Sequence, residues 1–265
     1  MIDYLLLGHL TRDLLNTGGS QPGGTALYAG LAAHQQQLQV GIVSARSELP
    51  DTWPVAIQLA WTNAATPPTF ENHYTATGRT QLLHSAAAAI VLADVPEQWR
   101  NAPIVHFGPV IQEIAESLLD AFPGALIGVT PQGWMRRWTA PLPTHITYRP
   151  WLPTPAQLAQ IDALVISIED VQGDEALVQA YATHCAIVAL TRGAGGATLF
   201  LDGQAVEIAA TPVIERDPTG AGDVFAATLF CGLHRGKTPL AAAHAAAKVA
   251  AASVEELGVA GLLKL

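Results

Sequence analysis

The chain has 265 residues, a mass of 27.8 kDa and a formal net charge of −9, and 50% of its residues are apolar. This balance excludes intrinsic disorder, and the acidic charge disfavours nucleic acid as a partner, because that binding requires a basic face. The longest uninterrupted apolar run, Ala86–Ala93, is too short for a membrane span, which needs about 18–20 residues. We expect a single domain over residues 1–265.

Three further features of the composition bear on location and assembly. Asp3 stands where a signal peptide would carry positive charge, so we expect a cytoplasmic protein. Cys185 and Cys231 lack the spacing of a zinc or redox motif and are predicted to be buried, reduced thiols. Charged residues make up only 13% of the chain, about half the usual quarter, which favours association into a homodimer.

Short apolar runs alternate with helical periodicity along most of the chain, which is typical of a parallel sheet flanked by helices. Strands are predicted at 4–7, 38–43, 104–107, 125–129, 163–168, 186–190, 197–201 and 205–208, and an Asp202-Gly203 turn joins the last two. Helices are predicted at 26–33, 112–121, 175–183, 221–234 and 239–257. We therefore predict a three-layer α/β/α sandwich with a mainly parallel central sheet.

Residues 61–85 depart from this alternation. Phe70–Thr75 and Arg79–His84 alternate polar and apolar residues around Ala76-Thr77-Gly78, a pattern typical of a hairpin with one solvated face. We expect segments at about 9–18 and 68–86 to form a small β lid over one edge of the main sheet. Residues 131–155 hold six prolines and three tryptophans and are predicted to be irregular surface structure.

One glycine-rich string indicates a specific chemistry. Asp217-Pro218-Thr219-Gly220-Ala221-Gly222-Asp223 leads directly into the helix predicted at 221–234. Free N–H groups and the positive end of the helix dipole make an anion site at such a start, and glycine lets backbone approach a phosphate closely. If a phosphoryl group docks there, Asp223 can accept a proton from an attacking hydroxyl. The alternative interpretation is an ordinary glycine-rich turn with an acidic cap.

The complete string resembles the signature of the PfkB, or ribokinase-like, carbohydrate kinases, which phosphorylate a hydroxyl of a sugar, polyol or nucleoside with ATP. The resemblance implies a ribokinase-like fold, a site at the carboxyl ends of the strands, and a need for ATP and Mg²⁺. Many relatives also use a monovalent cation such as K⁺. By this resemblance Asp223 is the catalytic base, and the amides of Gly220, Ala221 and Gly222 stabilise the transferring phosphoryl group.

The resemblance extends to a substrate site. Asp13 matches the family's aspartate that binds substrate hydroxyls, and Gly23 and Gly24 match its substrate-contacting glycine pair. Tyr28 stands where the family often has asparagine, which disfavours ribose and would let an aromatic ring stack on a nucleoside base. Arg79 of the lid is a further candidate for substrate contact, with an ordinary exposed strand arginine as the alternative.

The resemblance also implies positions for the donor and its metal ion. Asp170 and Glu169 lie in Ser167-Ile168-Glu169-Asp170, which takes the place of the family's Asn-x-x-Glu element, and a carboxylate suits the hard Mg²⁺ ion. This departure, together with Val129-Thr130-Pro131-Gln132-Gly133-Trp134, looks most like a branch near the myo-inositol kinases. The residues implied to bind ATP are Thr191, Gly193, Gly195, Asp217 and Thr219.

We therefore expect an ATP-dependent kinase of a small sugar or polyol, without nucleic acid or membrane partners. Two alternatives stay open. The first is a nucleoside kinase. The second is a non-catalytic, ligand-binding relative, because the chain is short for the family and departs from its Asn-x-x-Glu element. The intact string from Asp217 to Asp223 argues against the second alternative.

Overall fold

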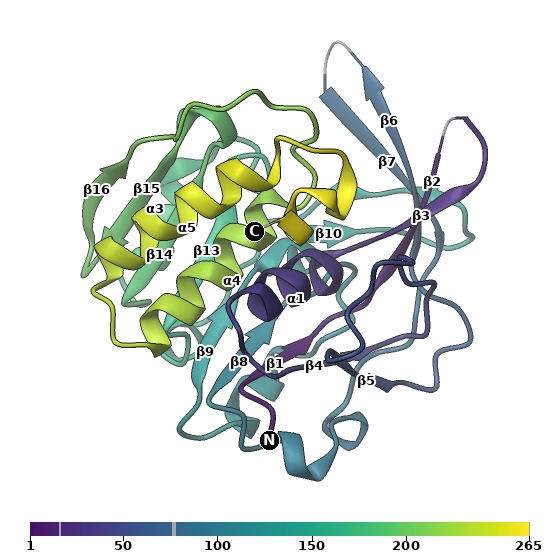
Figure 1. Ribbon diagram of the computed structural model, residues 1–265, viewed down its shortest axis with the longest axis horizontal. Coiled ribbons are helices and arrows are strands. Elements are labelled where there is room, and N and C mark those ends of the chain that lie inside the picture. The colour runs from purple at the N-terminus through teal and green to yellow at the C-terminus, as the bar shows by residue number, and fades with distance from the viewer. Residues whose placement is uncertain (16, 76–77, 265) are drawn as a thin grey trace.

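A computed structural model of the protein describes residues 1–15, 17–75 and 78–264, and for residues 74–79 it describes the backbone at most. The main sheet is built from β1 (Tyr4–Leu7), β4 (Val40–Ser44), β5 (Gln58–Trp61), β8 (Ile104–Phe107), β9 (Leu126–Val129), β13 (Ala163–Ser167), β14 (Ile187–Thr191), β15 (Ala197–Leu201) and β16 (Gln204–Ile208). Their order across the sheet is β16-β15-β14-β13-β9-β8-β1-β4-β5 (Figure 1).

Most of this sheet is parallel. Every neighbouring pair from β14 to β5 is parallel, whereas β15 and β16 extend the sheet as antiparallel strands. The carboxyl ends of seven strands therefore lie along one edge of the sheet. The mainly parallel central sheet predicted from the sequence is confirmed.

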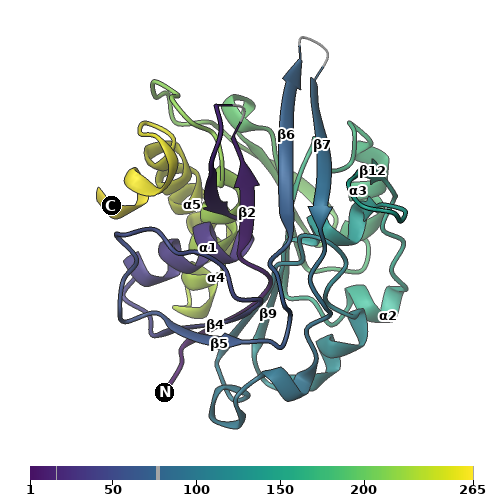
Figure 2. The ribbon, with the colours of Figure 1, turned by 90° about the vertical axis from the view of Figure 1, so that its right-hand side faces the viewer.

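Helices cover both faces of the main sheet (Figures 1 and 2). Tyr4 and Leu6 of β1 belong to the core beneath α1 (Thr25–Gln35), α4 (Ala221–His234) and α5 (Pro239–Ser253). Leu5 and Leu7 belong to the opposite core, beneath α2 (Pro155–Leu158) and α3 (Glu175–Ala182). Strands buried on both faces need apolar side chains at every position, which explains the short apolar runs. The predicted three-layer sandwich is confirmed, and no helix among the described residues is long and apolar enough to cross a membrane.

Two helix predictions need correction. The helix predicted at 112–121 is a 3-10 segment, Glu116–Ala121, because Glu113 turns its carboxylate back to Val110 N and Ile111 N, and the next residue pairs in a β-bridge with Ile90. The helix predicted at 239–257 ends at Ser253. Beyond it, the carbonyl oxygen of Val254 accepts N–H groups from residues 216 and 217, so the chain turns toward the glycine-rich string.

A second, smaller sheet lies at the carboxyl edge of the main one. Its strands are β2 (Thr11–Leu14), β3 (Ser20–Gly23), β6 (Thr69–Thr75), β7 (Gly78–Ser85) and β11 (Thr144–His145), in the order β11-β7-β6-β2-β3. Figure 2 shows β6 and β7 rising beyond the main sheet. Phe70 and Leu83 pack against Val110 and Ile111, which follow β8. The predicted segments 9–18 and 68–86 therefore contribute to one sheet, and residues 20–23 and 144–145 extend it.

The segment predicted to be irregular, 131–155, contains only short elements. They are a 3-10 segment Pro131–Met135, the paired strands β10 (Arg136–Arg137) and β12 (Thr147–Tyr148), and β11. Because β11 pairs with β7, this segment connects the end of β9 to the small sheet.

Candidate active site

The start of α4 presents backbone N–H groups without acceptors. Gly220 is the N-cap residue, with φ 80°, and no side chain caps the helix. Ala221 N donates to Pro218 O at 3.2 Å, whereas the N–H groups of Gly220, Gly222 and Asp223 have no acceptor among the described residues. A Cβ on Gly222 would meet only open space. Free N–H groups at the positive end of a helix dipole form a site suited to a phosphoryl group.

Tyr28 supports this start from below. A Cβ built on Gly220 would overlap the aromatic ring of Tyr28, so glycine is required at 220 both by its φ and by this contact. The Tyr28 side chain is 4% exposed. The structure therefore places its ring beneath the glycine-rich string, where no face is available to stack on an acceptor base.

The start of α1 meets the small sheet. A Cβ on Gly23 would come within 2.5 Å of Asp13 Oδ2, and a Cβ on Gly24, which has φ 89°, would come within 2.7 Å of the His9 carbonyl oxygen. Asp13 accepts a hydrogen bond from Thr11 Oγ1 at 3.1 Å. The glycine pair thus allows the Asp13 carboxylate of β2 to lie directly over the start of α1.

Thr25 connects the two helix starts. It is the first residue of α1, it is 4% exposed, and its side chain forms a hydrogen bond with Asp223 of α4. Sequence reasoning missed this residue, although its place directly after Gly23-Gly24 at a helix start was a usable signal.

The carboxyl group of Asp223 titrates near neutrality. Burial raises its pKa to about 7, and the negative charge of Asp170 acts in the same direction. The hydrogen bond from Thr25 and the positive charge of Arg136 lower the pKa, but by less. A general base works best when its pKa lies near the operating pH, so Asp223 is suited to accept a proton from an acceptor hydroxyl.

Arg136 is a second residue that sequence reasoning missed. Its Nη1 donates to Val110 O at 2.7 Å, and its guanidinium lies 5.4 Å from the centre of the Phe70 ring in the small sheet. It lies in the segment predicted to be irregular surface, where no local pattern marked it. Its charge influences Asp223, so it belongs to the electrostatic surroundings of the site.

Asp170, whose negative charge helps to raise the pKa of Asp223, is held by two donors. Gln132 Nε2 donates to Asp170 Oδ1 at 3.0 Å, and Ser167 N donates to Oδ2 at 3.2 Å. Glu169 is exposed on the same turn. Two carboxylates near an anion-binding helix start fit Mg²⁺, which proteins usually bind through one or two carboxylates together with substrate phosphates. No group of three or more metal-ligating side chains is present in the described part of the chain.

The predicted donor residues lie in two segments, the end of β14 with the turn after it, and the string before α4. Thr191 ends β14, and Gly193 and Gly195 are exposed on the 3-10 turn that follows. The carboxylate of Asp217 accepts Thr219 N at 3.0 Å and Gly258 N at 2.8 Å. Burial alone would raise the pKa of Asp217, but the Thr219 side chain and the N–H groups of Gly258 and Thr219 together lower it below its usual value. Asp217 therefore fixes the string against the segment after α5.

The side chain of Arg79, a candidate for substrate contact, lies outside the described residues. Asn72 and Gln81 of the small sheet are described. Their side chains are joined by a hydrogen bond of 2.7 Å, and their register places them on the same face as Phe70 and Leu83. Asp13 pairs with Phe70, so these amides share a face with that carboxylate.

Comparison with known proteins supports the expectation from the sequence. Residues 162–264 match the family model of the pfkB family carbohydrate kinases, a segment that includes Asp223. A cytidine kinase from Thermococcus kodakarensis is 24% identical over 258 residues, which cover 89% of this chain and 90% of that protein. A bifunctional protein HldE from Caulobacter is 41% identical over 93 residues, which cover 32% of this chain; the match spans only 19% of that protein.

Solved structures share the whole fold. A pyrophosphate-dependent kinase in the ribokinase family, complexed with a pyrophosphate analog and myo-inositol, matches with a TM-score of 0.80 and 19% identity over 96% of both chains. Ribokinase of Arabidopsis thaliana, complexed with ribose and ATP, matches with a TM-score of 0.70 and 17% identity, over 99% of this chain and 98% of that one. The predicted resemblance to the PfkB, ribokinase-like kinases is confirmed.

Proposed function

We propose that this chain transfers the γ-phosphoryl group of ATP to a hydroxyl of a small sugar or polyol. The proposal is supported by its ribokinase-like fold and by the match of residues 162–264 to the pfkB family. One observation carries the proposal. Asp223, with its pKa near 7, stands at the start of α4 beside N–H groups that have no acceptor among the described residues. A base and an anion-binding site side by side are what phosphoryl transfer to a hydroxyl requires.

The acceptor is held between the small sheet and the start of α4. Asp13 accepts hydrogen bonds from acceptor hydroxyls, and Gly23 and Gly24 let the acceptor approach the start of α1. Asp223 takes the proton of the acceptor's reacting hydroxyl, and the oxygen of that hydroxyl forms a bond to the γ-phosphorus. The bond from that phosphorus to the β-phosphate oxygen breaks, and ADP leaves. The small sheet acts as a lid that excludes water, which otherwise competes as an acceptor.

The charge on the transferring group is met by this chain's backbone. N–H groups at Gly220 and Gly222 point at its oxygens, and one such preorganised donor is worth about 3 kcal/mol of barrier. Asp170 and Glu169 would hold Mg²⁺, which neutralises phosphate oxygens when bound. Thr191, Gly193, Gly195 and Thr219 would lie against the donor, with Asp217 holding the string in place.

Pyrophosphate is the second candidate donor. It is favoured by the structural match of 0.80 to a pyrophosphate-dependent kinase, a higher score than the 0.70 match to an ATP-bound ribokinase. The same free N–H groups would bind the phosphoryl group from either donor.

A nucleoside is the second candidate acceptor. It is favoured by the cytidine kinase relative, which aligns over 89% of this chain. The buried position of Tyr28 weighs against the stacking contact that would have supported it. A non-catalytic, ligand-binding protein is the remaining alternative.

The test is turnover with each pairing of donor and acceptor. Mg-ATP or Mg-pyrophosphate is combined with myo-inositol, ribose, cytidine or adenosine, and release of ADP or phosphate is measured. We expect turnover with one polyol or sugar and its loss in Asp223→Asn. Asp174→Asn is the matched control, because Asp174 also lies at a helix start but on the opposite face of the sheet, where it caps α3. Turnover by Asp223→Asn at the wild-type rate would reject the assigned base, and ligand binding without turnover would favour the non-catalytic alternative.

A further inference from the structure

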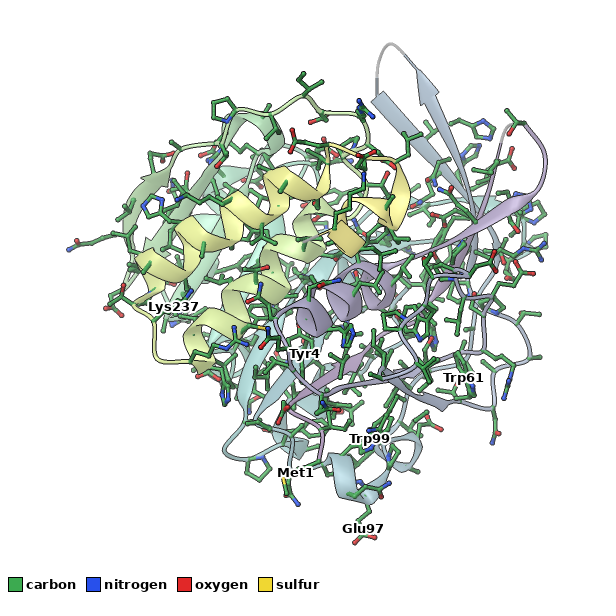
Figure 3. The ribbon with its side chains drawn as sticks, viewed as in Figure 1. Met1, Tyr4, Trp61, Glu97, Trp99 and Lys237 are labelled. Carbon is green, nitrogen blue, oxygen red and sulfur yellow. The ribbon has the colours of Figure 1, made fainter. Side chains whose placement is uncertain are left out.

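A buried chain of hydrogen bonds crosses three strands beneath α4. The Tyr4 hydroxyl lies 2.8 Å from His106 Nδ1, and His106 Nε2 lies 2.9 Å from Thr130 Oγ1. Tyr4 (labelled in Figure 3) and His106 are 0% exposed, and Thr130 is 7% exposed. The Phe230 ring of α4 packs edge-on against His106 at 5.1 Å between ring centres. This series of hydrogen bonds thus runs from the buried Tyr4 hydroxyl to Thr130, directly after the carboxyl end of β9.

The direction of these hydrogen bonds follows from protonation. Burial raises the pKa of Tyr4 well above its usual value, so Tyr4 keeps its proton. Its fully buried hydroxyl has one acceptor among the described residues, His106 Nδ1, and therefore donates to it. Burial lowers the pKa of His106 to about 3, so the ring is neutral and carries one N–H group. His106 Nδ1 must accept from Tyr4, and Nε2–H must donate to Thr130 Oγ1. The O–H group of Thr130 is therefore turned away from His106.

Thr130 lies at the edge where the candidate site opens. A Cβ built on Gly108 would lie 3.5 Å from Thr130 Oγ1 and in contact with the methyl group of Thr25, whose hydroxyl bonds Asp223. Within residues 1–15, 17–75 and 78–264 the Thr130 O–H has no acceptor. A buried donor without an acceptor is unfavourable, so a ligand oxygen there would be favoured.

We propose that Thr130 donates a hydrogen bond to an oxygen of the bound acceptor, and that Tyr4 and His106 are positioning residues that fix its direction. The inference rests on the proposed function and adds a binding residue to it. Gly108 lies between Thr130 and Thr25, since a Cβ built on it would approach both side chains, and Thr25 directly follows the glycine pair. Three of the predicted donor residues, Thr191, Gly193 and Gly195, lie at or just after the end of β14, two strands away from β9. We therefore assign the Thr130 contact to the acceptor and not to the phosphoryl donor.

The first test compares Thr130→Val, which removes the hydroxyl, with Thr130→Ser, which keeps it. We expect Thr130→Val to raise the KM for the acceptor about tenfold, the loss of about 1.4 kcal/mol of hydrogen bonding. The KM for the donor should not change, and Thr130→Ser should restore the acceptor KM. Thr228→Val is the matched control, because Thr228 is a buried threonine of α4 whose Oγ1 has no partner in the described part of the chain. An unchanged acceptor KM, or a change in donor KM alone, would overturn the proposal.

The second test reads the positioning role directly. In ¹⁵N-histidine NMR spectra at pH 7, we expect His106 to be neutral with its proton on Nε2. Tyr4→Phe should raise the acceptor KM in the wild-type background but not in Thr130→Val, because coupled residues do not act additively. Tyr181→Phe is the control, since that buried hydroxyl donates to Trp151 O in the other core. A proton on Nδ1, or additive effects of the two substitutions, would overturn the positioning role.

Failure of this inference is distinguishable from failure of the proposed function. If wild-type protein shows no turnover, the kinase proposal fails. The Thr130 contact is then measured by calorimetric titration with myo-inositol and with cytidine. Weaker binding to Thr130→Val than to wild type supports the contact, and equal or absent binding to both overturns it.

Discussion

The starts of α1 and α4 are built alike but open to different surroundings. Each follows a glycine with positive φ, Gly24 at 89° and Gly220 at 80°, and neither helix has a side-chain cap. At α1 the start is covered: Thr25 is 4% exposed, Asp13 lies against Gly23, and His9 and Thr11 lie against Gly24. At α4 the start is open, because Gly222 is exposed and no atom of residues 1–15, 17–75 or 78–264 lies within 4 Å of where its Cβ would be.

The same backbone feature, a helix start that follows a glycine with positive φ, can therefore serve two purposes. An open helix start leaves N–H groups for a phosphoryl group. A covered start uses the same absence of side chains to bring a carboxylate from another sheet into close contact. Thr25 joins them, because it begins the covered helix and bonds the base of the open one. The comparison predicts that substitutions at the two starts fail in different ways.

The largest effect is expected at the start of α4. Gly220→Ala places a side chain against the Tyr28 ring at an unfavourable φ, so we expect kcat to fall about 10²–10³-fold through loss of the phosphoryl-binding donors. The melting temperature should fall as well. Gly222→Ala should lower kcat without lowering the melting temperature, since its Cβ meets no protein atom. Equal losses of stability in both variants would contradict the distinction.

A smaller effect is expected at the start of α1. The Cβ of Gly24→Ala would lie 2.7 Å from His9 O and 2.8 Å from Thr11 Cγ2, which displaces the strand that carries Asp13. We expect the KM for the acceptor to rise up to about 10²-fold, a cost typical of a displacement near 1 Å. Gly19→Ala, at φ 84° with no atom of the described residues within 4 Å of the added Cβ, controls for backbone strain. A donor-specific defect in Gly24→Ala would break the comparison.

The pH dependence tests the link between the two helices. Since Asp223 must be ionised to act as a base, kcat/KM should rise with pH through about 7. Thr25→Val removes the hydrogen bond that lowers the pKa of Asp223, so the rise in kcat/KM should move to higher pH. Asp170→Asn removes a negative charge that raises this pKa, so the rise should move to lower pH. A shift of one unit changes the rate on the acid side about tenfold. Shifts in the same direction for both variants would contradict the assigned causes.

A separate effect is expected in stability. Because burial raises the pKa of Asp223 in the folded protein to about 7, the stability given by its protonated form is present below pH 4 and lost as pH rises toward 7. Asp223→Asn removes this loss, so it should melt higher than wild type at pH 8 but not at pH 4. One kcal/mol corresponds to about 2–4 °C for chains of this size. Parallel melting curves at both pH values would show that Asp223 is not desolvated.

Local patterns predicted the elements that depend on local causes. The helix Ala221–His234 and the strands Tyr4–Leu7, Ile104–Phe107 and Ala197–Leu201 have the bounds expected from sequence. Each is a dense apolar run with glycine or a turn beside it. Strands such as Gln58–Trp61 and Thr144–His145 were not predicted, because they are short and are fixed by pairing with neighbours distant in the chain.

The candidate site divides in the same way. The sequence predicted Asp13, the glycine pair and the string ending at Asp223, which are local motifs. The contacts of Thr25 with Asp223 and of Asp217 with Gly258 join residues far apart in the chain, and no local spacing records them. The wrong helix at 112–121 has a related cause, since the buried carboxylate of Glu113 binds the backbone of the preceding turn.

The contact between Tyr28 and Gly220 constrains the order in which this chain can change. While the tyrosine ring is present, any residue with a side chain at 220 collides with it. A smaller residue at 28 relieves that collision but removes the support beneath the glycine-rich string. Mutational histories are therefore expected to vary position 28 first and to leave position 220 unchanged. In a library randomised at both positions, the residues tolerated at 220 should depend on the residue present at 28.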